Sequence, residues 1–128
     1  MTPFRTILLV EDSPLTRRMI RQMLEQHGGF VVEEAIDGQD ALKRLATTRV
    51  DVVLSDLHMM PMDGQGLRDS IRAQAELSHL PFIMMTGQHC PEAIRRTVDD
   101  QGSHYLAKPF SREQLFQTLE RTMPRQAA

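Results

Sequence analysis

Short apolar runs alternate with helical patterns along almost the whole chain of 128 residues. Most of these runs are too short for helices, and they lack the polar alternation of a strand with one exposed face. They are therefore typical of strands buried on both faces. Five strands, each followed by a helix, predict an α/β fold: a doubly wound parallel sheet with helices on both faces. We predict strands at 6–10, 30–34, 50–55, 81–85 and 105–107.

The ends of several helices carry recognisable signals. Ser13 followed by Pro14 is typical of a helix start, and Gly28 is typical of a helix end. Ser111 with Gln114 three residues later has the spacing of a capping box, in which each residue bonds the other's main chain. We predict helices at 14–27, 39–47, 65–74, 91–99 and from 111 onward.

Composition narrows the class of protein. Fifteen Lys and Arg against seventeen Asp and Glu give a net charge of −2, so no basic excess points to nucleic acid or to an anionic membrane. Cys90 is the single cysteine, which excludes an intramolecular disulfide and fits a reducing compartment. No apolar run approaches the length of a signal peptide or a membrane span. We expect one cytoplasmic domain that spans 1–128, with its core at about 5–122 and without an output domain.

Polar side chains follow four of the five predicted strands. In open α/β sheets, ligands bind beyond the carboxyl ends of the strands, so residues that follow different strands are expected to converge there. Each residue alone has a plainer explanation, such as a helix cap or a solvated charge, but their joint placement does not. The residues are Glu11 and Asp12 after the first strand, Asp56 after the third, Thr86 after the fourth and Lys108 after the fifth.

The predicted convergence brings three carboxylates together. Two unit charges about 4 Å apart repel by about 4 kcal/mol at an effective dielectric near 20, so a cation or a bound proton is expected among them. Hard oxygen ligands in an incomplete cage favour Mg²⁺. Lys108 adds a compact positive charge that suits a carboxylate or a phosphoryl oxygen.

Four segments resemble the receiver domains of response regulators in bacterial two-component signalling. They occur in the family's order and spacing, over about residues 5–122. The resemblance implies a flavodoxin-like (βα)5 fold with strand order 2-1-3-4-5. The segments are Leu9-Val-Glu-Asp-Ser13, Leu54-Ser-Asp-Leu-His-Met-Met-Pro-Met-Asp-Gly64, Met85-Thr-Gly87 and Tyr105-Leu-Ala-Lys-Pro-Phe110.

The resemblance also implies roles for individual residues. Asp56 corresponds to the phosphoacceptor, and Lys108, in a cis Lys108–Pro109 peptide, to the lysine that contacts the phosphoryl group. Thr86 and Tyr105 correspond to the switch pair. Glu11, Asp12 and Asp56, with the main-chain carbonyl of His58, correspond to the Mg²⁺ ligands. The side chains of His58 and Gln88 correspond to variable positions that tune loss of the phosphoryl group.

Partners follow from the same resemblance. The donor is a sensor histidine kinase or a histidine phosphotransfer protein, and the target binds the face built by the fourth helix, fifth strand and fifth helix. From the charge balance, we expect no nucleic-acid or membrane partner. A stand-alone receiver is expected, because no output segment follows the last helix; a fragment of a longer regulator stays open. In this family such a domain catalyses only its own phosphorylation and dephosphorylation.

One feature of the chain departs from the family's pattern. Where the family commonly reads Asp-x-x-Met-Pro-x-Met-Asp-Gly, this chain places Met60 at the proline position and Pro61 after it, although loop length is kept. We expect Met59, Met60 and Met62 to pack the loop, and the arginines of the first helix to form a solvated basic face.

Three alternatives are less well supported. A haloacid-dehalogenase-like phosphatase requires a second Asp as general acid/base two residues after the nucleophile, and this position is His58. A flavodoxin-like cofactor binder would meet repulsion between Glu11, Asp12 and its phosphate. A pseudo-receiver that only binds proteins would lack a site residue, and none is missing.

Overall fold

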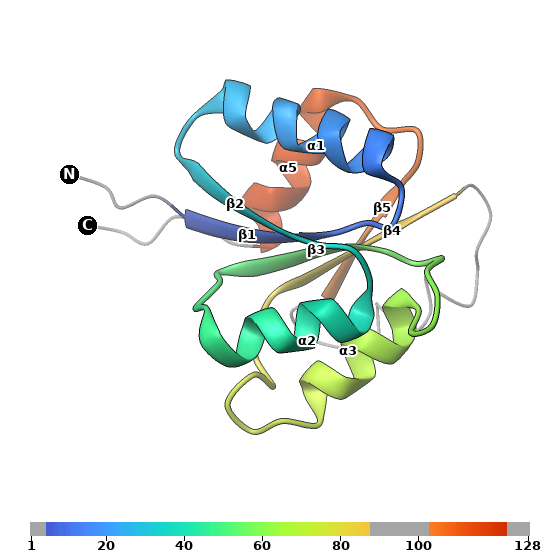
Figure 1. Cartoon of the computed structure of the whole chain (residues 1–128). Helices are drawn as coiled ribbons and strands as arrows, with labels where there is room; N and C mark the ends of the chain where they lie inside the picture. Colours follow the sequence, from blue (N-terminus) through green and yellow to red (C-terminus); the bar gives the residue numbers. More distant parts are fainter. Residues whose placement is uncertain (1–4, 88–102, 123–128) are drawn as a thin grey trace, which may run out of the picture.

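The computed structural model of the chain describes residues 5–87 and 103–122. Its five strands are all parallel, in the order β2-β1-β3-β4-β5 (Figure 1). This confirms the predicted fold class and strand order. The strands are β1 (Arg5–Val10), β2 (Phe30–Ala35), β3 (Val52–Asp56), β4 (Phe82–Thr86) and β5 (Ser103–Ala107).

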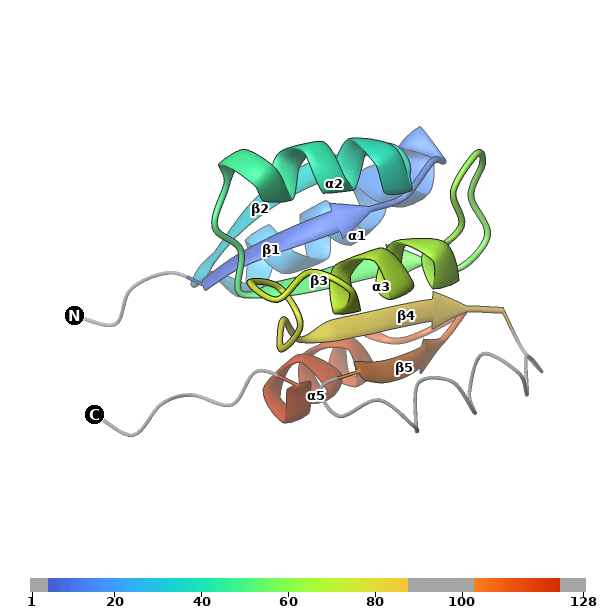
Figure 2. The same cartoon turned by 90° about the horizontal axis from the view of Figure 1, so that it is seen from below.

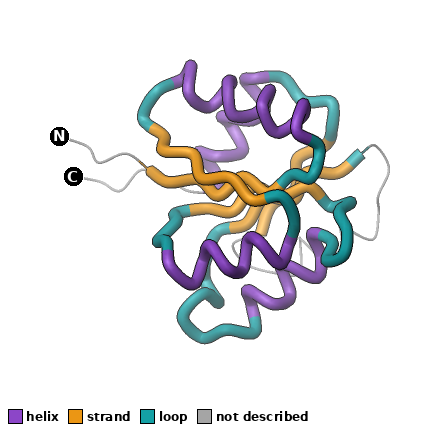
Figure 3. The backbone as a smooth tube through the Cα atoms, viewed as in Figure 1, coloured by secondary structure: helices purple, strands orange, loops and turns teal. Residues whose placement is uncertain are grey.

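Helices cover both faces of the sheet, with α1 and α5 on one side and α2 and α3 on the other (Figure 3). The predicted helix at 91–99 lies outside the described residues. None of the helices within 5–87 and 103–122 combines the length and apolar character needed to cross a membrane. The described helices are α1 (Pro14–His27), α2 (Gly38–Thr47), α3 (Gly64–Arg72) and α5 (Arg112–Thr122).

The sheet separates two apolar layers, because successive strand residues point to opposite faces. In β1, Ile7 and Leu9 face the layer formed with α1 and α5, whereas Leu8 and Val10 face the layer formed with α2 and α3. All four side chains are fully buried. This two-sided burial explains the continuous apolar run in the sequence.

The predicted helix ends are confirmed at α1 and α5. The Ser13 hydroxyl accepts a hydrogen bond from the Thr16 amide at 3.3 Å, and Gly28 ends α1 with a φ of 82°. At α5, the Gln114 side chain accepts from the Ser111 amide at 2.8 Å, while the Ser111 hydroxyl accepts from the Gln114 amide at 3.1 Å. The capping box therefore forms in both directions.

The loop between β3 and α3 keeps Gly64 against the end of β3. A Cβ atom at Gly64 would lie 2.5 Å from the Asp56 carbonyl oxygen and 2.6 Å from Met84 Sδ. The Met60–Pro61 and Lys108–Pro109 peptides are both cis, the second as predicted. Contrary to our expectation that it packs the loop, Met60 is 81% exposed, whereas Met59 is buried.

Gly64→Ala is expected to lower the free energy of unfolding by about 2 kcal/mol, because overpacking beside main chain forces a backbone shift. Denaturant titration of the wild-type protein and of each variant gives the free energy of unfolding. Gly87→Ala is the matched control, since a Cβ there meets nothing within 4 Å. Equal stability of the two variants would show that the β3–α3 loop yields easily.

Candidate functional site

The carboxyl ends of the strands meet at one edge of the sheet, where the arrowheads of β1, β4 and β5 point the same way (Figure 2). Glu11 follows β1 and Asp56 ends β3, and both are buried. Lys108 follows β5, and its Nζ lies 3.2 Å from Glu11 Oε1 and 3.2 Å from Asp56 Oδ1. Three residues from three strand ends thus form one ion-pair network, as the sequence predicted.

Asp12 completes an acidic cluster with Glu11 and Asp56. One carboxylate oxygen from each residue lies within 4.8 Å of the other two. Asp12 is exposed, so the cluster opens to solvent on its side, while Glu11 and Asp56 form its buried wall. Three oxygen donors at this spacing suit a hard divalent cation that keeps part of its water shell.

Burial and crowding raise the pKa of Glu11 from 4.5 to about 7. The largest cause is desolvation, followed by the hydrogen bond and the negative charge of Asp56, and Lys108 offsets only part of this. Glu11 Oε2 is buried and has no hydrogen-bond partner. A buried carboxylate oxygen of this kind is satisfied by a proton or by a cation, so the donor set fits a metal ion.

Thr86 ends β4 beside this cluster. Its side chain is fully buried, and the hydroxyl donates to the main-chain oxygen of Gly87 at 2.7 Å. The Thr86 carbonyl accepts a 2.6 Å hydrogen bond from the Lys108 amide. The main chains that carry the hydroxyl and the ammonium group are therefore directly linked.

Three further residues were predicted to belong to the site: Tyr105, His58 and Gln88. Tyr105 is half-buried in β5 and points to the face opposite Leu106, which packs with α1 and α5. The side chain of His58 is exposed in the β3–α3 loop, and Gln88 lies outside the described residues.

One contact beside the site was missed from the sequence. The arginines of α1 were expected to form a solvated face, but Arg17 is largely buried and donates to the Glu11 carbonyl and to Glu34. The only signal in the sequence was an acidic residue, Glu34, at the end of the predicted second strand.

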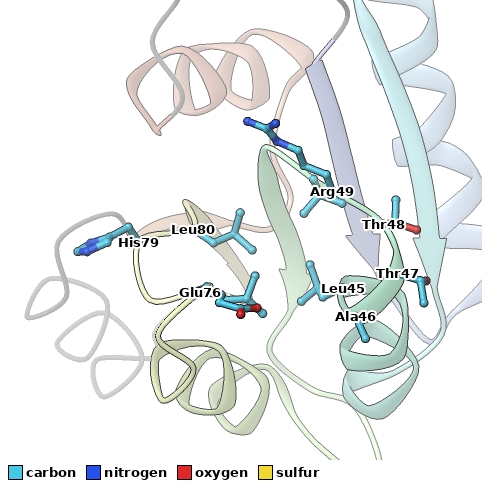
Figure 4. A pocket seen from close by; sticks show the side chains of 10 residues that line it. Leu45, Ala46, Thr47, Thr48, Arg49, Glu76, His79 and Leu80 are labelled. Carbon is cyan, nitrogen blue, oxygen red and sulfur yellow. The ribbon is translucent and has the colours of Figure 1, made fainter.

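A cavity of about 440 Å³ lies at the opposite edge of the sheet, between the end of α2 and the chain that leads into β4 (Figure 4). Leu45, Leu77 and Leu80 line it, together with Arg49 and Glu76. None of the predicted site residues within 5–87 and 103–122 borders it, so the acidic cluster is the better candidate site.

The chain matches the response regulator receiver domain family over residues 7–120. It belongs to this family. Over 119 residues it is 34% identical to chemotaxis protein CheY-3 of Vibrio cholerae, covering 93% of this chain and 92% of that protein. The crystal structure of Vibrio cholerae CheY4 superposes with a TM-score of 0.85 at 33% identity, covering 93% of this chain and 98% of the other.

A third relative carries a metal. The receiver domain of sensor histidine kinase PA1611 from Pseudomonas aeruginosa has a magnesium ion coordinated in its active-site cleft. It matches with a TM-score of 0.83 and 32% identity, covering 95% of this chain and 99% of that domain. Receiver domains are signalling modules of two-component phosphorelays rather than enzymes. They interact with histidine kinases and downstream targets, and they bind Mg²⁺ at an acidic pocket.

Proposed function

We propose that this receiver domain accepts a phosphoryl group on Asp56 from a phosphohistidine of a sensor histidine kinase or a histidine phosphotransfer protein. The observation that carries the proposal is the Lys108 ammonium group, bonded to both Asp56 and Glu11 beside the three clustered carboxylates. An Asp56 oxygen attacks phosphorus, the histidine N–P bond breaks, and an acyl phosphate forms. Apart from this transfer and the loss of the group, the protein catalyses no reaction.

The residues around Asp56 provide charge and position. Phosphoryl transfer depends mainly on positioning and on neutralising the oxygens of the transferred group, and Lys108 is placed to do so. Glu11, Asp12 and Asp56, with the main-chain carbonyl of His58, would hold Mg²⁺. When bound, the ion supplies positive charge to the carboxylates and to the phosphoryl oxygens. The relative that carries magnesium in its cleft supports this assignment.

The direct test is labelling of the wild-type protein with acetyl phosphate. We expect one phosphoryl group per chain in the presence of Mg²⁺ and little labelling in EDTA. Borohydride reduction of the acyl phosphate followed by peptide mass spectrometry should place the group at Asp56. A label on another residue, or the same labelling in EDTA, would contradict the proposal.

We propose a conformational switch as the output of phosphorylation. The Thr86 hydroxyl leaves the Gly87 oxygen, bonds the phosphoryl group, and vacates space that Tyr105 fills. The surface formed by β5 and α5 then changes its affinity for a target protein; the predicted helix at 91–99, which the resemblance adds to this surface, lies outside the described residues. Moving a population from 1:99 to 99:1 takes about 5.5 kcal/mol. New bonds from Thr86 and Lys108 to a charged group, at about 1.5–3 kcal/mol each, approach that value.

Thr86→Ala is expected to weaken this coupling while Asp56 still accepts the phosphoryl group. NMR spectra of the free and phosphorylated forms should show smaller shift changes in β5 and α5 than the wild-type protein shows. Thr86→Ser keeps the hydroxyl and serves as the control, with changes close to those of the wild type. Wild-type changes in Thr86→Ala would exclude the hydroxyl as the switch.

Competing functions find less support in the geometry. The exposed His58 stands where a haloacid-dehalogenase-like phosphatase would need a second Asp. A pseudo-receiver would lack part of the Glu11, Asp56 and Lys108 network, which is intact.

We propose a cytoplasmic location for the protein. The chain has a single cysteine, which fits a reducing compartment, and it has no basic excess that would favour an anionic membrane.

A further inference from the structure

Arg17 connects three separate segments beside the acidic cluster. Its Nη1 donates to the main-chain carbonyl of Glu11 at 2.8 Å, and its Nε donates to Glu34 Oε1 at 3.0 Å. Its own amide is bonded to the Ser13 carbonyl at 2.9 Å. Through its guanidinium group and its amide, Arg17 thus links the end of β1, the end of β2 and the first turn of α1.

Glu34 is itself held in place. It also accepts a hydrogen bond from Arg21, one turn further along α1. The residue after Glu34, Ala35, accepts a 3.1 Å hydrogen bond from the Glu11 amide. The main chain of Glu11 is therefore tied on both sides, through its amide to β2 and through its carbonyl to Arg17.

We propose that Arg17, held by Glu34, is a positioning residue that fixes the main chain of Glu11 and so keeps the Glu11 and Asp12 carboxylates facing Asp56. The part of this role that concerns Mg²⁺ rests on the proposed function. Lys108 holds one carboxylate oxygen of Glu11, but Asp56 repels the side chain and Oε2 has no hydrogen-bond partner, so the main chain has to fix the rest of its position. A guanidinium fork can bond the carbonyl and Glu34 together, whereas an ammonium group is a single point charge.

A purely stabilising ion pair makes a different prediction. The Arg17 and Glu34 side chains are 18% and 31% exposed, so solvent screens their ion pair and its contribution to stability is small. By charge alone, removing the arginine would strengthen the binding of a divalent cation to the nearby carboxylates. If Arg17 instead positions Glu11 and Asp12, its removal should weaken the binding of the cation to their carboxylates. The sign of the change in Mg²⁺ affinity therefore separates the two roles.

The experiment measures the Kd for Mg²⁺. Mg²⁺ alone is titrated into the full chain, and binding is monitored by calorimetry or by the NMR signal of the Asp12 amide. Arg17→Gln is expected to raise the Kd for Mg²⁺ about tenfold, as loss of a group that orients metal ligands does. Arg17→Lys should restore only part of the affinity. Arg18→Gln, an equal charge change at the exposed neighbouring residue, should leave the Kd unchanged or slightly lower. Unchanged or tighter binding in Arg17→Gln would overturn the proposal.

Hydrogen exchange in EDTA tests the same role without metal. Arg17→Gln should speed exchange of the Glu11 amide, which bonds Ala35, and leave the Leu54 amide in the middle of β3 unchanged. Unchanged exchange at Glu11 would contradict the positioning role. A wild-type protein that binds no Mg²⁺ and takes no phosphoryl group would instead contradict the proposed function, and the exchange result would still decide whether Arg17 fixes Glu11.

Discussion

Asp56→Asn is expected to abolish phosphoryl uptake from acetyl phosphate. The amide keeps the shape of the side chain but removes the negative oxygen that attacks phosphorus. It also removes one of the three carboxylates in the cluster and one of the two negative charges that Lys108 Nζ contacts. Because Asp56 raises the pKa of Glu11, the same substitution should lower that pKa. Mass spectrometry of the intact protein after incubation with acetyl phosphate and Mg²⁺ measures the uptake.

A matched control separates this effect from a general loss of charge. Asp69→Asn makes the same chemical change on an exposed residue of α3 and should leave uptake at the wild-type level. Circular dichroism should show both variants folded, since neither removes an apolar core side chain. Persistent labelling of Asp56→Asn would exclude Asp56 as the acceptor, even if the rest of the site geometry stood.

The sequence predicted the series of elements better than their ends. Val50 was included in the third strand because it is apolar, yet β3 begins at Val52, where pairing with β1 starts, and extends to Asp56. Val50 is buried in the preceding loop. Hydrophobicity reports burial and not hydrogen bonding, so a buried residue just outside a strand cannot be told from one inside it. The strand order itself came from the resemblance, because periodicity does not say which strands are neighbours.

The site was predictable where it depends on strand ends. Glu11, Asp56 and Lys108 each follow or end a buried strand, and a parallel sheet brings such positions to one edge. The contact of Arg17 with Glu34 was not predictable, because it depends on how far α1 lies from β2. Met60 was misjudged for a related reason, since nothing in its local sequence distinguishes an inward from an outward methionine in a loop.

The metal-free protein is expected to lose stability as pH rises from about 4.5 to about 7, through Glu11. The pKa of this carboxyl group is higher in the folded than in the unfolded protein, so the folded state binds more protons across this interval. Stability therefore falls as pH increases. The shift from 4.5 to about 7 corresponds to a loss of about 3 kcal/mol, at 1.36 kcal/mol for each pKa unit.

Glu11→Gln should remove this pH dependence. Denaturant titrations in EDTA, at about pH 5 and about pH 8, give the free energy of unfolding of each protein. His104 affects stability in the opposite direction. Burial lowers its pKa, so its contribution to the free energy of unfolding is lost as pH falls. Comparison of the wild type with Glu11→Gln cancels that contribution. Asp12→Asn removes the same charge from the exposed member of the cluster and should keep the wild-type pH dependence of stability.

Mg²⁺ should reverse the loss of stability in the wild-type protein. A cation favours the charged form of Glu11, so protons compete with Mg²⁺ below the raised pKa and affinity increases as pH rises toward about 7. Added Mg²⁺ therefore stabilises the wild type more at about pH 8 than at about pH 5. Glu11→Gln should gain less at either pH, because it offers one ligand charge fewer. Parallel stability curves for the two proteins, with and without Mg²⁺, would show that the buried carboxylate of Glu11 neither holds a proton at neutral pH nor binds the ion.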